Sequence, residues 1–322
     1  MNAIVGVDIA KDSFEACLLD EQGQVHEASF PNLLKGIKQF ERWLKQLGCG
    51  KAHVCLEATG IYGDLLAETL HKHQHPVSVV NPARIKAYAE SRMQRNKTDQ
   101  LDAALIAVYC RTQQPPLWTP PPAEVKALRA LVRHLDDLKQ EKQRARNRLE
   151  SQRTSSPIKA HLDEQIRVLD KQIKHTEYLI HDHINQHPDL KRCDDLLQSI
   201  PGIGTLTSSL IMAEFGDMTR FDDVRDVVAF VGLNPRQNQS GKKRSTQGIS
   251  RMGRASLRAA LFLPALVAKR RNPRLKAWAE QLERRGLTPK QATVAVMRKL
   301  IHLAYGILKS GRPFDPNYGC AS

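Results

Sequence analysis

The segment AIVGVDIAKDSFEACLL, residues 3–19, decides the architecture of the first third of the chain. Residues 3–8 form a short apolar run that ends on Asp8, and residues 13–19 alternate between apolar and polar side chains as a half-buried strand does. The turn sequence DEQGQ, residues 20–24, leads into a further stretch over residues 25–30. The chain is therefore expected to begin with three consecutive strands.

Helices and strands alternate over the rest of this segment, as the spacing of apolar residues shows. The predicted elements are a helix over 33–47, a strand over 52–56 that leads to Glu57, a helix over 64–73, a strand over 77–80 and a helix over 99–109. Three strands followed by helix, strand, helix, strand and helix form an α/β order. This order matches the ribonuclease H-like layout of a mixed sheet flanked by helices.

The remainder of the chain reads as helical. Five prolines between residues 111 and 124 preclude a continuous helix and indicate a domain boundary. Beyond them a long helix begins near Val125, and a second helix over 162–180 has apolar residues at heptad spacing. Such a hairpin either packs on its own chain or forms a coiled-coil arm for self-association. We expect an α/β domain over 1–120, a coiled-coil helical hairpin over 121–187 and a mainly α domain over 188–322.

Charge is distributed unevenly along this chain of 322 residues, whose net charge is +15. Residues 1–120 hold thirteen basic and thirteen acidic side chains, whereas residues 227–279 hold twelve basic side chains and no acidic one. This concentration is typical of a protein that grips the phosphate backbone of nucleic acid, because a basic face kept for solubility normally mixes both signs. The cations expected at this interface are Arg236, Lys242, Lys243, Arg244, Arg251, Arg254 and Arg258.

The motif PGIG, residues 201–204, is followed by Thr205 and predicts the turn of a helix-hairpin-helix element. A glycine-rich turn and a helix N-terminus can present backbone N–H groups to a phosphate. Gly202 and Gly204 therefore join the expected nucleic-acid interface. An ordinary tight turn is the alternative interpretation.

Composition excludes several classes of protein. With 41% hydrophobic and 26% charged residues the chain is not of a disordered type. Its longest apolar stretch, residues 259–268, is interrupted by Pro264 and is shorter than the roughly 20 residues of a membrane helix. The first residues lack the pattern of a signal peptide, so we expect a cytoplasmic protein. Six cysteines without a CxxC pair predict neither a zinc site nor a disulfide framework.

Four carboxylates occur where strand ends and a helix start are expected to converge. Asp8 and Glu57 end strands, and Asp99 and Asp102 stand three apart on one face of a helix. Oxygen ligands of this kind suit Mg²⁺, for which Mn²⁺ can substitute, and two such ions can bridge a phosphodiester. Each carboxylate taken alone has a structural explanation, such as a turn or a helix-dipole contact. Their order and context favour a two-metal site.

Six motifs occur in order along nearly the whole chain: GVDIAKDSF, CLEATGIYG, NPARIKAYAESRMQRNKTDQLDA, SIPGIG, FVGLNPRQNQSGKKR and SRMGRASLRAALFLPA. Together they resemble the DEDD-type insertion-sequence transposases and the related Piv-type DNA invertases, a group that includes the bridge-RNA-guided recombinases. The resemblance implies a RuvC-like N-terminal domain and a C-terminal transposase domain with a catalytic serine. It places the acidic tetrad on Asp8, Glu57, Asp99 and Asp102, and the serine on Ser240.

The resemblance also implies an enzyme that excises and inserts its own mobile element. Ser240 would attack a DNA phosphodiester and form a covalent phosphoserine, while the acidic site polarises the same phosphate. The implied partners are donor and target DNA, a structured noncoding guide RNA, and further copies of the chain as a dimer or tetramer. From the residues alone, Ser240 before Gly241 reads as an ordinary turn, although Lys242 and Lys243 beside it could hold a phosphate.

The sequence leaves other functions open. A Holliday-junction resolvase-like metal nuclease would use the acidic site, leave hydrolysed ends and form no bond to Ser240. A non-catalytic nucleic-acid-binding protein would keep the acidic residues for structural reasons. A site-specific DNA invertase would share the transposase chemistry and differ in the arrangement of its DNA.

Overall fold

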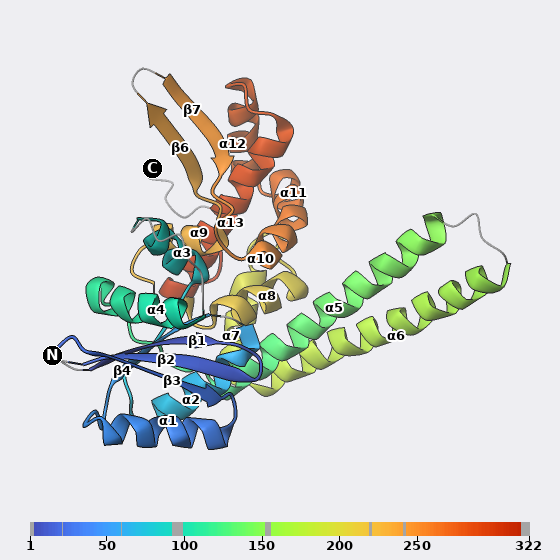
Figure 1. Ribbon diagram of the computed structural model, residues 1–322. Helices are drawn as coiled ribbons and strands as arrows, with labels where there is room; N and C mark the ends of the chain where they lie inside the picture. Colours follow the sequence, from blue (N-terminus) through green and yellow to red (C-terminus); the bar gives the residue numbers. More distant parts are fainter. Residues whose placement is uncertain are drawn as a thin grey trace. The chain divides into compact units, whose positions relative to one another are not determined.

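The computed structural model describes residues 3–20, 22–58, 60–91, 99–151, 156–218, 221–240 and 243–316. The chain divides into two compact units, Met1–Pro120 and Pro121–Ser322 (Figure 1). In the described part of the chain, no helix combines the length and the apolar character needed to cross a membrane.

A five-stranded mixed sheet forms the centre of the N-terminal unit. Its strands are β1 (Ile4–Ile9), β2 (Ser13–Leu19), β3 (Val25–Pro31), β4 (His53–Glu57) and β5 (Val77–Val80). They lie in the order β3-β2-β1-β4-β5. β1, β2 and β3 pair antiparallel, whereas β4 runs parallel to both β1 and β5. The α/β class predicted for this unit is confirmed.

Helices cover both faces of the sheet. They are α1 (Leu34–Gln46), α2 (Asp64–Lys72), α3 (Pro82–Ser91) and α4 (Asp99–Gln113), with a short 3-10 helix, η1 (Gly60–Tyr62). Val5 and Val7 of β1 pack into the cluster that contains apolar residues of α1 and α2. The even-numbered residues of β1 point to the other face of the sheet, toward α4 and α3. Ile4 packs there into the cluster around Ile106 of α4. The sheet is therefore the middle of three layers.

Gly6 allows α4 to contact β1 directly. A Cβ atom built on Gly6 would lie 2.1 Å from the carbonyl oxygen of Ala103 and 2.2 Å from the backbone nitrogen of Ala107. No side chain fits in this space, so the backbone of the strand touches the backbone of the helix. This close packing sets the position of α4 over the sheet.

Two long helices open the C-terminal unit. α5 (Ala123–Ser151) and α6 (Ser156–Gln186) lie side by side as a hairpin (Figure 1). Leu135 of α5 and the heptad residues Leu169 and Ile180 of α6 are buried in one cluster, which continues into the helices that follow. The hairpin expected over 121–187 therefore shares a hydrophobic core with the segment 188–322. Those helices are α7 (Pro188–Gln198), α8 (Thr205–Phe215), α9 (Val224–Val231), α10 (Ala255–Ala260), α11 (Phe262–Arg271), α12 (Pro273–Arg284) and α13 (Pro289–Ser310).

A β-hairpin interrupts this unit, for which the sequence predicts helices and an ordinary turn at Ser240. β6 (Pro235–Ser240) and β7 (Lys243–Ile249) pair antiparallel, with an irregular register near Pro235. The sequence does not predict these two strands, because PRQNQS and KRSTQGI show no regular alternation of apolar and polar residues.

Candidate active site and nucleic-acid interface

Asp8 and Glu57 lie on neighbouring strands at the same edge of the sheet. β1 and β4 pair in parallel with Gly6 opposite Cys55, so two positions further along Asp8 comes opposite Glu57. Neighbouring strands are about 4.8 Å apart, and both carboxylates are half-buried. Because Asp8 has the same parity as Gly6, it belongs to the face of the sheet that α4 covers.

The direction of α4 brings its first turn toward this edge. Ala103 contacts Gly6, while Ile4, at the other end of β1, packs into the cluster that contains Tyr109 and Cys110. α4 therefore runs antiparallel to β1 and begins toward the end of the strand that carries Asp8.

The remaining two members of the expected tetrad lie in this first turn. Asp102 is half-buried and immediately precedes Ala103. Asp99 is the first residue of α4, and its side chain lies outside the described residues. Among the side chains that the structure describes, no three His, Cys, Asp or Glu form a group able to hold a metal ion. The metal site stays a prediction, supported by the placement of Asp8 and Glu57.

Ser240 is the last residue of β6, in the C-terminal unit. It pairs in register with Lys243, the first residue of β7, and Gln239 pairs with Arg244. The serine therefore stands beside the turn of the hairpin. The side chains of residues 236–247 lie outside the described part of the chain, and so do residues 241–242 altogether. The phosphate contacts expected of Arg236, Lys242, Lys243 and Arg244 stay predictions.

The base of this hairpin is held by contacts from outside its strands. Just beyond the two strand ends, the Ser250 hydroxyl donates to the Asn234 side-chain oxygen, and the Ser250 N–H donates to the Asn234 carbonyl at 2.9 Å. Arg258 Nη1 donates to the carbonyl oxygens of Val231 at 2.8 Å and Gly253 at 3.0 Å. Arg258, expected at the nucleic-acid interface, thus uses one of its nitrogens inside the fold.

The other described cations of the expected interface are arranged differently. Arg251 is exposed and adopts a left-handed backbone, with φ of 57°. Arg254 has 51% of its side chain exposed, its Nε lies 3.3 Å from Oε2 of the buried Glu214, and its guanidinium stands over the ring of Phe230. Burial and then the charge of Arg251 lower the pKa of Arg258. Arg251 and about half of the Arg254 side chain are therefore accessible to solvent. No pattern in the sequence indicates the contact of Arg254 with Glu214.

The two glycines of the PGIG turn have different surroundings. Gly202 has φ of 104°, and a Cβ there would lie 2.5 Å from the carbonyl oxygen of Pro264, so the turn packs tightly on α11. Gly204 precedes α8 as its N-cap in an extended conformation, and no atom lies within 4 Å of where its Cβ would be. Of the two, only Gly204 has open space around it for a phosphate.

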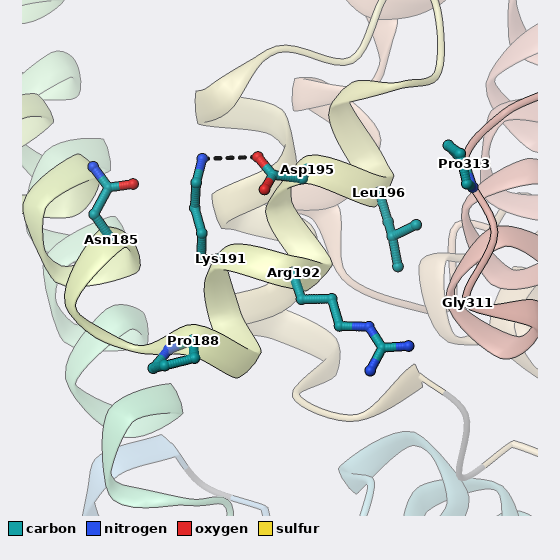
Figure 2. Close-up of a pocket in the computed structure, with 8 residues that line it drawn as sticks. All are labelled: Asn185, Pro188, Lys191, Arg192, Asp195, Leu196, Gly311 and Pro313. Atoms are coloured by element: carbon teal, nitrogen blue, oxygen red, sulfur yellow. Dashed lines mark hydrogen bonds and ion pairs between the residues drawn. The ribbon is translucent and has the colours of Figure 1, made fainter.

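A hollow of about 680 Å³ lies in the C-terminal unit, and Figure 2 shows the residues that line it. Two cations line it, and one of them, Lys191, forms a 2.7 Å ion pair with Asp195. With a single carboxylate this hollow is distinct from the acidic site. Its lining residues are Asn185, Pro188, Lys191, Arg192, Asp195, Leu196, Gly311 and Pro313.

Comparison with known proteins identifies the family. A family model described as a transposase, of the DEDD IS110 type, matches residues 5–155. A second, described as "Transposase IS116/IS110/IS902 family", matches residues 194–280. The chain is 35% identical to the pilin gene-inverting protein of Moraxella bovis over 317 residues, which are 97% of each chain. It therefore belongs to the IS110-type transposase family, and with it to the enzymes that cleave and rejoin DNA.

Two further similarities are weaker. The chain is 27% identical to the transposase for insertion sequence element IS1111A of Coxiella burnetii, over 95% of this chain and 89% of that one. A solved structure, T. thermophilus RuvC in complex with a Holliday junction substrate, is matched over 37% of this chain and all of that one, at 11% identity and a TM-score of 0.28. A TM-score this low does not establish a shared fold.

The resemblance drawn from the six motifs is confirmed by the family models and by the Moraxella relative.

Proposed function

We propose that the protein is a DNA recombinase that moves an insertion-sequence element, with a ribonuclease H-like acidic site and Ser240 as its nucleophile. The observation that carries the proposal is the placement of Asp8 opposite Glu57, on the sheet face covered by α4 and toward the end where α4 begins. Carboxylates on elements that converge in this way suit divalent cations.

Asp8, Glu57, Asp99 and Asp102 would hold Mg²⁺. The fit rests on the donor set: Asp8 and Glu57 bring hard oxygen ligands from adjacent strands, and α4 begins toward the same edge. Mg²⁺, when bound, supplies positive charge that polarises the scissile phosphate and stabilises the leaving oxygen. The half-buried setting of the two strand carboxylates favours this role, because partial burial strengthens their attraction for a cation.

Ser240 would attack the phosphorus of the scissile phosphodiester. Its hydroxyl oxygen forms a bond to phosphorus, the bond to the DNA 3′ or 5′ oxygen breaks, and the hydroxyl proton leaves to solvent or to the departing oxygen. The phosphoserine preserves the energy of the phosphodiester, so a DNA hydroxyl can later reverse the step and rejoin a strand. Lys243 pairs in register with Ser240, and Arg244 pairs with Gln239 beside it. These two residues would supply the positive charge that binds this phosphate.

A covalent adduct tests this chemistry. The protein, Mg²⁺ and matched donor, target and RNA are incubated, and DNA joined to protein is sought on denaturing gels and by mass spectrometry. We expect an adduct in the wild type and none in Ser240→Ala or Asp8→Ala. Free hydrolysed ends that require Asp8 but not Ser240 would instead establish a metal nuclease of the resolvase type.

The acidic site and Ser240 lie in different units of the chain, and we propose that they act on one phosphate within an oligomer. Mixing the inactive variants Asp8→Ala and Ser240→Ala tests whether protomers share a site. Restored cleavage in the mixture means that the carboxylates of one copy serve the serine of another. Cleavage that stays absent means that each copy supplies both.

A structured noncoding RNA is proposed as the guide that selects target DNA, and the basic residues of 227–279 offer the surface for nucleic acid. Purification with and without the transcript of the element tests this part. Equal recombination without RNA would remove the guide from the proposal. We place this activity on the bacterial nucleoid, in the cytoplasm.

DNA inversion is the second candidate, because the Moraxella relative is a pilin gene-inverting protein. Inversion and transposition share cleavage and rejoining and differ in how the DNA sites are arranged. Element termini flanking the gene would favour transposition, whereas a neighbouring segment found in both orientations would favour inversion.

A further inference from the structure

The pairing of β1 with β4 stops one position short of the acidic residues. Its register ends with Val7 opposite Leu56. Beyond that point Asp8 still pairs with a residue of β2, and Glu57 still pairs with a residue of β5. Each acidic residue is therefore held to its outer neighbouring strand, and the distance between the two also depends on contacts beyond the pairing of β1 with β4.

Asn32, between β3 and α1, bridges the two chain segments that follow these strands. Its Nδ2 donates to the carbonyl oxygen of Ala10 at 3.1 Å and to that of Tyr62 at 3.0 Å. Ala10 lies two residues after Asp8, and Tyr62, in η1, lies five residues after Glu57. One amide group thus ties the continuation of β1 to the continuation of β4, at the edge of the sheet where both carboxylates lie.

The backbone around Asn32 is held in place from two sides. Its N–H donates to the carbonyl oxygen of Asp12 at 2.9 Å. A Cβ atom on Gly36 would lie 1.9 Å from the carbonyl oxygen of Pro31, so the first turn of α1 packs directly on the residue before Asn32. The amide of Asn32 therefore projects from a fixed point of the fold.

The other end of the bridge packs on both strands. A Cβ atom on Gly63, the residue after η1, would lie 3.2 Å from Cδ1 of Leu56 and 3.5 Å from Cδ1 of Ile9. Ile9 follows Asp8, and Leu56 precedes Glu57. A shift of η1 would therefore reach the neighbours of both acidic residues.

The side chain of Asn32 does not cap the helix that it precedes. An asparagine at the start of a helix commonly accepts a hydrogen bond from a backbone N–H of the first turn. Here Leu33 is the N-cap of α1, and the Oδ1 atom of Asn32 is buried and accepts no hydrogen bond from the residues that the structure describes. Both contacts of the amide are carbonyl oxygens, which only its nitrogen can face. Its orientation therefore serves the bridge and not the helix.

We propose that Asn32 is a positioning residue of the acidic site, whose two hydrogen bonds hold the ends of β1 and β4 where Asp8 and Glu57 can bind one divalent cation together. The inference rests on the proposed function, because it requires metal at this site. Asn32 is not itself a ligand in this arrangement, since its nitrogen is a donor. Without the bridge the two segments move independently, so ordering the two carboxylates around a cation costs affinity. Groups that orient metal ligands typically contribute about 10–100-fold to metal affinity.

Metal binding tests the bridge without DNA. Mn²⁺ alone is titrated into the full chain, and electron paramagnetic resonance measures the free ion. We expect the wild type to bind Mn²⁺ at a site that Asp8→Ala lacks. Asn32→Ala and Asn32→Leu should bind there about 10–100-fold more weakly. Alanine removes the donor, and leucine removes it at nearly constant side-chain volume, so the two variants test the same loss with and without a gap.

Asp20→Ala is the matched control. The Asp20 carboxylate accepts from the backbone N–H groups of Gln22 at 2.9 Å and Gln24 at 2.7 Å, so this variant also loses two hydrogen bonds between a side chain and the backbone. The turn that contains Asp20 lies at the other end of β1, because Leu19 pairs with Ile4. Asp20→Ala should therefore bind Mn²⁺ as the wild type does.

Two results of the titration have different meanings. Binding in both Asn32 variants that equals binding in the wild type, while Asp8→Ala has lost the site, would overturn the inference and leave the proposed function intact. Binding in Asp8→Ala that equals binding in the wild type would overturn the metal site of the proposed function, and the inference with it.

The dependence of DNA cleavage on Mg²⁺ separates positioning from a general loss of structure. Asn32→Ala should need about 10–100-fold more Mg²⁺ than the wild type for half-maximal cleavage. Its rate should recover at saturating Mg²⁺, because the bound ion then holds the two carboxylates together. A rate that falls by the same factor at every Mg²⁺ concentration would show that Asn32 supports only the fold, and would overturn the inference.

Discussion

The acidic site and the serine hairpin are built in opposite ways. Asp8 is the next-to-last residue of β1, and Glu57 is the last residue of β4. Both strands pack on both faces, so the sheet and α4 set the separation of the two residues. Ser240 ends a polar two-stranded hairpin whose base is fixed by Asn234, Ser250 and Arg258. A core holds the first site, and a few hydrogen bonds orient the second. Changes in the core should therefore alter both the stability of the protein and its cleavage of DNA. Changes in the hairpin should alter one of these two properties without the other.

Replacement of Ser240 should abolish cleavage without changing stability, which is the largest effect that we expect. We expect Ser240→Ala to lower the rate of strand cleavage on the order of 10⁴-fold or more, because the nucleophile is lost. The melting temperature should stay the same, since Ser240 is the last residue of the polar strand β6. Single-turnover cleavage and thermal melting measure the two effects. Ser256→Ala, an exposed serine of the same unit, is the control, and cleavage within tenfold of wild type in Ser240→Ala would contradict this assignment.

Replacement of Glu57 should reduce cleavage on the order of 1000-fold, because a metal contributes several kcal/mol of transition-state stabilisation. Mg²⁺ at about 100 times its Kd should stabilise the wild type by about 2.7 kcal/mol, and Glu57→Gln much less. Denaturant unfolding with and without Mg²⁺ measures this difference. Glu27→Gln, an exposed carboxylate on β3 of the same sheet, should respond to Mg²⁺ as the wild type does. Equal stabilisation of all three proteins would place the ion elsewhere.

Gly6 tests whether the core sets the acidic site. We expect Gly6→Ala to lower the free energy of unfolding by about 1–3 kcal/mol or more, because its Cβ would overlap the backbone of α4. Cleavage should fall as well, since α4 carries Asp102. Gly50→Ala is the matched control, because no atom lies within 4 Å of its added Cβ. Normal stability in Gly6→Ala would show that α4 is not packed on β1 as described.

Arg258 tests the base of the hairpin with the smallest expected effect. We expect Arg258→Met to lower the free energy of unfolding by about 1–3 kcal/mol, because the carbonyl oxygens of Val231 and Gly253 lose their hydrogen-bond donor. A direct phosphate contact would instead reduce the slope of log affinity against log salt by about 0.9. Titration of DNA binding at several salt concentrations distinguishes these roles. Arg270→Met, at an exposed arginine, is the charge-matched control. An unchanged stability in Arg258→Met would contradict a structural role for the hydrogen bonds of Arg258 to Val231 and Gly253.

Much of the N-terminal unit was predictable from the sequence. All five strands and the helices α1, α2 and α4 fall within a few residues of their expected bounds, because their apolar residues repeat every two or every 3.6 positions. α3 was missed because its only buried residue is Ile85, which makes no stripe. The hairpin of β6 and β7 was missed because its strands are mostly polar and show no alternation of apolar and polar residues.

The candidate acids were predictable for a related reason. Asp8 and Glu57 each follow an apolar run, so the sequence alone marks them as strand ends. The same logic cannot find Glu214 beneath Arg254, or Asn234 beside Ser250, since these pairs join positions brought close only by packing.

By itself the sequence determined the order of the five strands and of α1, α2 and α4 in the N-terminal unit, the candidate acidic residues, the basic tract and the family. Only the tertiary structure decided that Gly6 touches α4 and that Asp8 stands opposite Glu57. Periodic burial is encoded locally, in each run of residues. Contacts between distant residues depend on strand order, register and helix direction, which are set by the packing of the whole unit.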